Sequence, residues 1–389
     1  MASYISSNAN RFYTGLETTY GVVPTITAAN RIPALKLMVQ QELEVAQRKD
    51  KTGSRTFVGL PTGGRRRTNF ELQTHLTTRQ TGAPAYGPLF QSALGAAPML
   101  YAGGTVSSAD ATGKLKFSTP HGLVAGQAVY FGEDVRFVAA IVDANTVQLN
   151  APFTVIPSAG ASIGPTVTYV PATEIPSVSI FDYWTPSTAV QRVLAGAAVD
   201  QLDILVNGDY HEFHFRGVAQ DVLDSSSFSA GGPQQLQSFP PEPALAAFDY
   251  TIVPGNLGQA WLGTSPSQFF TITSASVQLK NSLDTRTKEF GSNLPRAIAP
   301  GRRSVTATFT LHGLDDTATT GLYQAARQQS PVTVMFQLGE SSGQTMAVNL
   351  KSVIPEVPEF DDSTNRLQWK FRASRAQGTA DDEMTVAFA

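Results

Sequence analysis

Apolar and polar positions alternate along several short stretches of the chain, a pattern typical of β-strands with one buried face. The alternation is clear over residues 332–338 and 367–373, and it returns over 64–76, whose sequence is GRRRTNFELQTHL. Gly and Pro (32 and 24 of the 389 residues) separate these stretches and predict many turns. The sequence therefore predicts a mainly β protein.

Two stretches show helical spacing instead of alternation. Residues 86–94 and 322–326 each carry their apolar side chains on one helical face. Asp315 and Asp316 precede the second stretch, and either carboxylate can accept hydrogen bonds from the free N–H groups that begin a helix. We expect one short helix at each place.

The same succession of features occurs twice along the chain. In each half a strand, a long polar loop, a basic turn and an alternating strand precede the short helix. The basic turn and strand of the second half read GRRSVTATFTLHGL, residues 301–314. We align Phe70 with Phe309 within these strands, and the FHFR motif at 213–216 with the WKFR motif at 369–372. A repeat of this kind predicts a duplicated domain.

The first copy has more residues between its two matched motifs than the second copy, and this surplus predicts an inserted domain. We expect two tandem β-sandwich or barrel domains, each with a short helix, together with a small all-β insert. The prolines of the sequence FPPEP between the copies favour a stiff linker. The expected boundaries are 1–30 for an N-terminal arm, 31–103 and 171–245 for the first domain, 104–170 for the insert and 246–389 for the second domain.

The composition narrows the choice of partners. A net charge of −3 and a pI near 6.0 argue against a surface built to coat nucleic acid. The chain has no cysteine, which excludes disulfides and Cys-ligated metal sites, and we expect no cofactor. No apolar run approaches the roughly 18 residues of a membrane span, and the first residues lack the apolar segment of a signal peptide. We therefore expect no membrane partner and a protein that is cytoplasmic when made.

Two motifs are superficially similar to catalytic or metal-binding patterns. Residues 339–343 (GESSG) match G-x-S-x-G, but that motif needs a following helix and a later histidine. Here a strand pattern follows Ser341 and every histidine precedes it, so we expect a hairpin turn. His211 and His214 lie in a strand pattern that sends their side chains to opposite faces, which predicts a surface pair and not a metal site. We expect no catalytic residue.

Two similar β domains in one chain leave sheet edges that must be covered or paired. If the domains pair edge to edge heterologously, the repeated interface closes a ring or extends a filament. A few two-domain subunits would thus form one closed inner β-barrel. The long loops 42–64 and 283–302 would then project from the ring and meet the next one.

Basic residues concentrate in these loops and in the two basic turns. A solvated turn is the alternative explanation for any one of them. Their recurrence at matching places favours contact with a partner surface, and the acidic total makes a protein neighbour a better candidate than DNA. The expected contacts between subunits or rings are Arg48, Lys49, Lys51, Arg55, Arg65, Arg66, Arg67, Arg286, Lys288, Arg302 and Arg303.

The chain resembles the major tail tube proteins of long-tailed bacteriophages. The resemblance rests on GLETTYGVVP (15–24), which is similar to the family's N-terminal arm, on the repeated strand–loop–GRR–strand–helix unit, on residues 193–217 and on the closing DDEMTVAFA (381–389). It covers nearly the whole chain apart from the insert, which is similar to small β modules that decorate tail tubes externally.

The resemblance implies a structural protein of the virion and not an enzyme, assembled in the cytoplasm of a host bacterium. Its duplicated members form trimeric rings with pseudo-sixfold symmetry, which stack into a channel that delivers the genome. The implied partners are further copies of the chain, other tail proteins at the tube ends, and double-stranded DNA that passes transiently without sequence-specific binding.

A channel for DNA should not retain phosphates, because each cationic contact adds affinity through counterion release. We therefore expect a neutral or acidic lumen. On the strand at residues 70–73 the apolar face leaves Glu71 and Gln73 on the other side, and their counterparts are Thr308 and Thr310. We expect these four residues to face the channel; the alternative is an ordinary solvated sheet face.

A second functional class is a carbohydrate- or receptor-binding β protein of a tail or adhesin. Such a protein would expose a cluster of aromatic side chains in its loops. Most aromatic residues of this chain lie in alternating strands, with Trp184 and Trp261 as exceptions.

Overall fold

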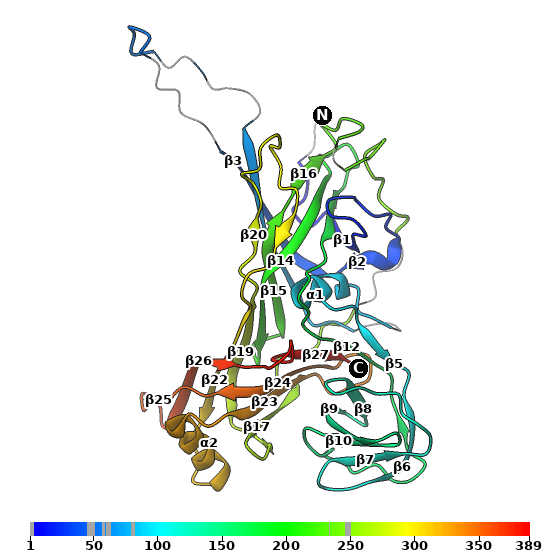
Figure 1. Cartoon of the computed structure of the whole chain (residues 1–389), viewed down its shortest axis with the longest axis vertical. Coiled ribbons are helices and arrows are strands. Elements are labelled where there is room, and N and C mark those ends of the chain that lie inside the picture. The colour runs from blue at the N-terminus through cyan, green and yellow to red at the C-terminus, as the bar shows by residue number, and fades with distance from the viewer. Residues whose placement is uncertain are drawn as a thin grey trace.

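The structure is a computed structural model that describes residues 4–44, 51–56, 59, 64–78, 82–232, 234–245 and 250–389. It confirms a mainly β fold with two tandem β domains, each with one short α-helix, and a small all-β inserted domain. The molecule is elongated, with the first domain at one end and the second domain and the insert at the other (Figure 1).

The first domain contains most of the strands before residue 230. Its elements are β1 (Asn10–Leu16), the 3-10 helix η1 (Ala28–Asn30), β2 (Arg31–Ile32), β3 (Ala34–Glu44), β4 (Arg65–His75), α1 (Gly87–Leu94), β5 (Met99–Tyr101), β12 (Thr166–Tyr169), β13 (Val178–Trp184), β14 (Arg192–Val206), β15 (Glu212–Ala219) and β16 (Asp221–Asp224). Successive antiparallel pairs give the order β1–β13–β14–β15–β4–β3. The helix α1 follows β4 and buries Leu89, Phe90 and Ala93, as its spacing predicts.

The second domain repeats this arrangement. Its elements are β17 (Gly258–Gly263), β18 (Ser267–Gln268), β19 (Ile272–Lys280), β20 (Asp284–Thr285), β21 (Ile298–Ala299), β22 (Ser304–His312), α2 (Thr317–Gln328), β23 (Val332–Leu338), β24 (Met346–Ile354), β25 (Glu359–Asp361), β26 (Gln368–Ala376) and β27 (Thr385–Phe388). The strand order is β17–β23–β24–β26–β22–β19, the same as in the first half. Asp316 caps α2 by accepting the N–H of Thr319 at 2.7 Å, which confirms one of the two predicted caps.

The insert forms its own six-stranded sheet in the order β11–β6–β7–β10–β9–β8. Its strands are β6 (Gly104–Ala109), β7 (Lys114–Phe117), β8 (Ala128–Phe131), β9 (Asp134–Asp143), β10 (Thr146–Leu149) and β11 (Ser162–Ile163). The strand β12 falls within the range expected for the insert, yet it pairs with β5 and with β27 of the large sheet. The C-terminal strand thereby bridges the two halves of the chain.

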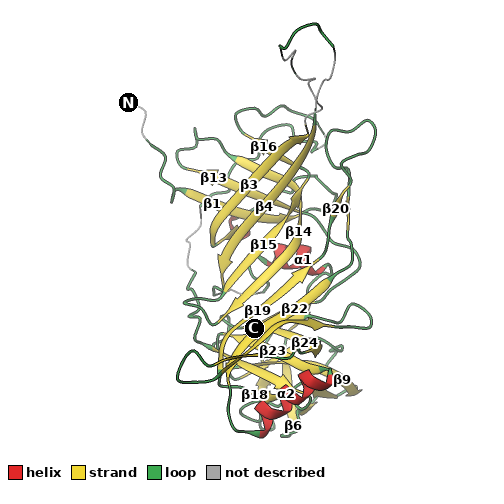
Figure 2. Cartoon of the chain, turned by 90° about the vertical axis from the view of Figure 1, so that its left-hand side faces the viewer, coloured by secondary structure: helices red, strands yellow, loops and turns green. Residues whose placement is uncertain are grey.

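The two large domains share one continuous sheet because β14 is 15 residues long. Its first half pairs with β13 and β16, and its second half, residues 201–206, lies between β15 and β19 of the second domain. The change of partner coincides with a β-bulge between Val199 and Gln201. The sheet therefore runs β3–β4–β15–β14–β19–β22–β26–β25, and Figure 2 looks onto it with α1 behind.

The ladder register corrects the expected alignment of the two halves. Gln73 lies opposite His214, and Thr310 lies opposite Lys370. His214 and Lys370 take the same place in the FHFR and WKFR motifs, so Gln73 corresponds to Thr310 and the alignment of Phe70 with Phe309 is wrong by two residues. A shift of two keeps apolar residues on the same face, which is why the alternation alone does not detect it.

Candidate assembly interfaces and channel face

One face of the continuous sheet packs on the core and the other is polar. Phe70 and Leu72 are 4% and 0% exposed, whereas Glu71 and Gln73 are half-buried on the opposite face. The second half repeats the alternation, with Thr310 half-buried and Thr308 exposed. All four residues expected at the channel thus share the polar face of one sheet.

Three cations on this face, Arg216, Lys370 and Arg372, are paired with carboxylates from neighbouring strands. The guanidinium of Arg216 lies 2.7 Å from a carboxylate oxygen of Asp203 and 3.4 Å from one of Glu71. Hydrogen bonds from Gln73 and Arg216 lower the pKa of Glu71, which keeps that carboxylate ionised.

The second half of the sheet repeats this pairing. Arg372 lies 2.5 Å from Glu359, and Lys370 forms an ion pair with Asp361 whose hydrogen bond lowers the pKa of the carboxyl group. The result is a polar face on which Arg216, Lys370 and Arg372 are all neutralised locally.

The first basic cluster lies in a strand and not in the expected turn. Arg65, Arg66 and Arg67 begin β4, where Glu44 and Glu42 of β3 lie opposite the outer two. The loop 283–302 brings Lys288 to the same groove, which has a volume of about 300 Å³. This loop does not simply project, because the N–H of Arg66 donates to the carbonyl oxygen of Asn293 at 2.9 Å.

Some of the remaining basic candidates form ion pairs within the chain, and others are exposed. Arg303 forms ion pairs with Asp381 and, at 3.0 Å, with Glu383, and Arg286 pairs with Glu289. Arg302 is exposed beside Arg303. Lys51 and Arg55 are also exposed, whereas Arg48 and Lys49 lie outside the described residues.

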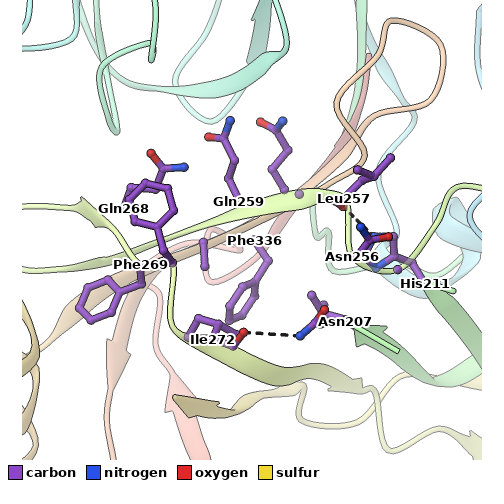
Figure 3. Close-up of a pocket in the computed structure, with 15 residues that line it drawn as sticks. Asn207, His211, Asn256, Leu257, Gln259, Gln268, Phe269, Ile272 and Phe336 are labelled. Atoms are coloured by element: carbon purple, nitrogen blue, oxygen red, sulfur yellow. Dashed lines mark hydrogen bonds between the residues drawn. The ribbon is translucent and has the colours of Figure 1, made fainter. Parts of the chain in front are cut away.

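A pocket of about 170 Å³ lies where the β14–β15 turn meets β17 (Figure 3). Its polar groups tie the backbone together: His211 Nε2 lies 2.9 Å from the carbonyl oxygen of Leu257, and the amide of Asn207 donates to Thr273 at 2.7 Å. His211 is buried, which lowers its pKa, so the expectation of a surface pair with His214 is wrong for this residue. These hydrogen bonds therefore hold the β14–β15 turn against the second domain.

Other candidate chemistry has a structural explanation. Residues 339–343 form the hairpin turn between β23 and β24, as expected. The described residues contain no group of three or more His, Cys, Asp or Glu side chains placed to hold a metal ion. Within the same part of the chain, no helix is both long and apolar enough to cross a membrane.

A comparison with protein families identifies the chain. Residues 7–389 match the family model described as phage tail tube protein. The chain belongs to the phage tail tube protein family. Among solved structures, it is similar to the SPP1 tail tube determined by solid-state NMR and cryo-EM, with 12% identity, coverage of 33% of this chain and 81% of that chain, and a TM-score of 0.27. No curated protein matches the chain.

Membership of this family makes the chain a structural subunit of a phage tail tube, which assembles with copies of itself in the tail of the virion.

The alternative function, a carbohydrate- or receptor-binding protein, needs exposed aromatic side chains, and one of the two candidate residues is buried. Trp261 is only 7% exposed, and the guanidinium of Arg136 from the insert covers its ring at 4.6 Å from the centroid.

Sequence reasoning did not find the charge pairs of the polar face. Their basic members were visible, because FHFR and WKFR place Arg216, Lys370 and Arg372 at alternate positions. Their acidic partners come from other strands and are identified only by the register.

Proposed function

We propose that three copies of this chain close into a ring with pseudo-sixfold symmetry, and that the rings stack into a channel through which phage DNA enters the bacterial host. Each chain would supply two tail-tube domains. The boundaries would lie near 1–30 for the arm, 31–103 and 171–245 for the first domain, 104–170 for the insert and 246–389 for the second domain, with β12 at the end of the insert range belonging to the large sheet. Other tail proteins would cover the tube ends, and assembly would take place in the host cytoplasm.

The observation that carries the proposal is the in-chain junction of β14 with β19, which joins two domains of the same strand order edge to edge. In the described part of the chain, β3 forms a ladder with β4 alone, and β25 forms one with β26 alone. One sheet therefore begins and ends in open edges on the two domains. Open edges favour pairing with another chain, and a heterologous contact closes a ring when its repeated rotation completes a full turn.

The charges of the polar face support a channel for DNA. Glu71, Asp203, Glu359 and Asp361 neutralise the basic groups beside them. The cations of these pairs are already neutralised, so this part of the face would add little counterion-release affinity for a passing phosphate, whereas Lys36, Lys280 and Arg375 are exposed on the same face. The basic groove that contains Arg65, Arg67 and Lys288 lies beyond this paired region, and we assign it to contacts between subunits or between rings.

Electron microscopy of the purified protein tests the proposal. We expect rings or stacked tubes whose class averages show six similar density lobes around an open centre, with three additional outer lobes from the insert. Dispersed monomers at high protein concentration, or rings with another number of lobes, would contradict it. Binding to glycans without assembly would favour the carbohydrate- or receptor-binding alternative.

A further inference from the structure

The two open edges of the sheet specify how neighbouring copies pair. We propose that β25 of one copy pairs antiparallel with β3 of the next, with Glu359 opposite Gln40, Phe360 opposite Val39 and Asp361 opposite Met38. This register rests on the proposed ring and assigns its closing contact at the level of single residues.

The first step equates β25 with the second half of β14. In the first domain, Asp203 and Ile204 lie opposite His214 and Phe213 of the FHFR motif. In the second domain, Glu359 and Phe360 lie opposite Lys370 and Trp369 of the WKFR motif. Because the two motifs correspond residue by residue, Asp203 corresponds to Glu359, Ile204 to Phe360 and Leu205 to Asp361.

The second step equates β3 with β19. Gln73 corresponds to Thr310, so two residues earlier Glu71 corresponds to Thr308. Met38 lies opposite Glu71, and Ser276 lies opposite Thr308. Met38 therefore corresponds to Ser276, and the next positions match as Val39 with Val277 and Gln40 with Gln278.

The third step transfers the junction seen within the chain to the junction between copies. In the chain, β14 and β19 pair with Asp203 opposite Gln278, Ile204 opposite Val277 and Leu205 opposite Ser276. Replacing each residue by its counterpart in the other domain gives the register proposed above.

Exposure at the two edges agrees with this pairing. Phe360 is 53% exposed and Val39 is half-buried, whereas their counterparts Ile204 and Val277, which are already paired, are both 0% exposed. The ring of Phe360 stacks on the ring of Trp369, with centroids 5.2 Å apart and planes at 12°, and this contact orients Phe360 at the open edge. Pairing would cover the apolar side chain that the open edge leaves in water.

Charge on the polar face is also complementary. Asp361 would lie opposite Met38, so Lys36 of the neighbouring copy becomes its diagonal neighbour two residues along β3, within reach of a long side chain. Asp361 at one edge would thus meet Lys36 at the other. Both residues are at least partly exposed in the single chain.

Engineered disulfides test the register, and the chain has no cysteine that would interfere. Directly opposed residues of antiparallel strands have Cα atoms about 4.5–5.5 Å apart, within the range of a disulfide. We expect the double variant Gln40→Cys/Glu359→Cys, oxidised after assembly, to give a covalent trimer on a non-reducing gel that returns to monomer with reductant. Another directly opposed pair, Leu205→Cys/Ser276→Cys from the junction within the chain, checks the method, because its disulfide forms within a monomer.

The matched control is Glu42→Cys/Asp361→Cys, which is four residues out of register, about 14 Å along the strand. Electron microscopy under reducing conditions confirms that each variant still assembles. If rings form but the control variant cross-links, the proposed register is wrong. It is also wrong if rings form and neither variant cross-links. In both cases the proposed ring is still supported. If the unmodified chain forms no rings, the proposed function fails first and the register with it.

Discussion

Arg136 of the insert offers a quantitative test of how this module is attached. Its side chain is 0% exposed and lies between the insert and the second domain. It donates hydrogen bonds to the carbonyl oxygens of Pro152 and Val135, both at 2.8 Å, and lies 3.3 Å from a carboxylate oxygen of Asp134. Burial lowers the pKa of Arg136 to about 10 despite Asp134, so its partners offset only part of the desolvation cost.

Replacing this residue by the similarly long Met removes the charge and keeps much of the packing. Asp134 is itself 3% exposed and would remain as a buried carboxylate without its cation. Removing one partner of a buried pair typically costs about 3–5 kcal/mol, and the lost stacking over Trp261 adds up to about 2 kcal/mol. Since Met recovers part of this by apolar contact, we expect Arg136→Met to lower the unfolding free energy of the insert–second domain unit by about 3–5 kcal/mol.

The assay is urea denaturation followed by tryptophan fluorescence, together with limited proteolysis of the segments that flank the insert. We expect an earlier transition and faster cleavage on both sides of the insert. Arg327→Met, at an exposed position of α2, is the control and should change the unfolding free energy by less than about 0.5 kcal/mol. Adding Asp134→Asn to Arg136→Met should cost less than the sum of the single changes. A loss below about 1 kcal/mol for Arg136→Met would refute this account of the interface.

Three further changes test other parts of the molecule. Glu71→Lys combined with Thr310→Lys should slow DNA ejection from assembled tails, since each new cation adds phosphate affinity; unchanged ejection kinetics with intact tubes would place these residues away from the channel. Burial alone would raise the pKa of Glu242, but hydrogen bonds from Arg11 and Tyr13 outweigh it and lower the pKa. The stabilisation from this pair is therefore present above the unfolded pKa of about 4.3 and is lost as the pH falls through the folded value. Glu242→Gln should remove that acid sensitivity, and a pH titration of thermal stability that is identical in both proteins would contradict it. Phe90→Ala should cost about 3–5 kcal/mol in chemical denaturation, because the ring packs among the buried aromatic rings of both halves; a cost below 1 kcal/mol would show that the core collapses around it.

Local features of the fold could be predicted from the sequence because alternation, helical spacing and turn residues act over a few positions. Both helices, the cap at Asp316 and the hairpin at 339–343 follow from such patterns. The pairing of distant strands does not. Nothing in residues 201–206 indicates that β19, and not a strand of the same domain, lies on their outer side.

In the candidate site, too, features set by neighbouring residues could be predicted, whereas contacts between distant residues could not. The polar face that carries Glu71 and Thr310 follows from the period of a strand, and burial confirms that both side chains lie on the side opposite the core. The burial of His211 depends on the backbone of Leu257, a partner 46 positions away, which no local pattern reveals. The neutralising partners of Arg216 depend on register, where an error of two residues leaves every apolar side chain on its correct face.

The two domains also cover corresponding apolar surfaces with different segments of the chain. Tyr13 and Phe181 lie opposite each other on β1 and β13, as Trp261 and Met335 do on β17 and β23. The first pair packs in a cluster with Val23, against which the linker residue Phe239 also packs, and the second packs against Tyr130 and Phe137 of the insert.

Each pair lies on the side of its sheet away from the shared core, where an apolar surface left open would favour aggregation. The insert therefore takes the place in the second domain that the N-terminal segment and the linker take in the first. Deleting it would expose Trp261 and Met335, so a tube made without the insert would need compensating polar substitutions at these two positions.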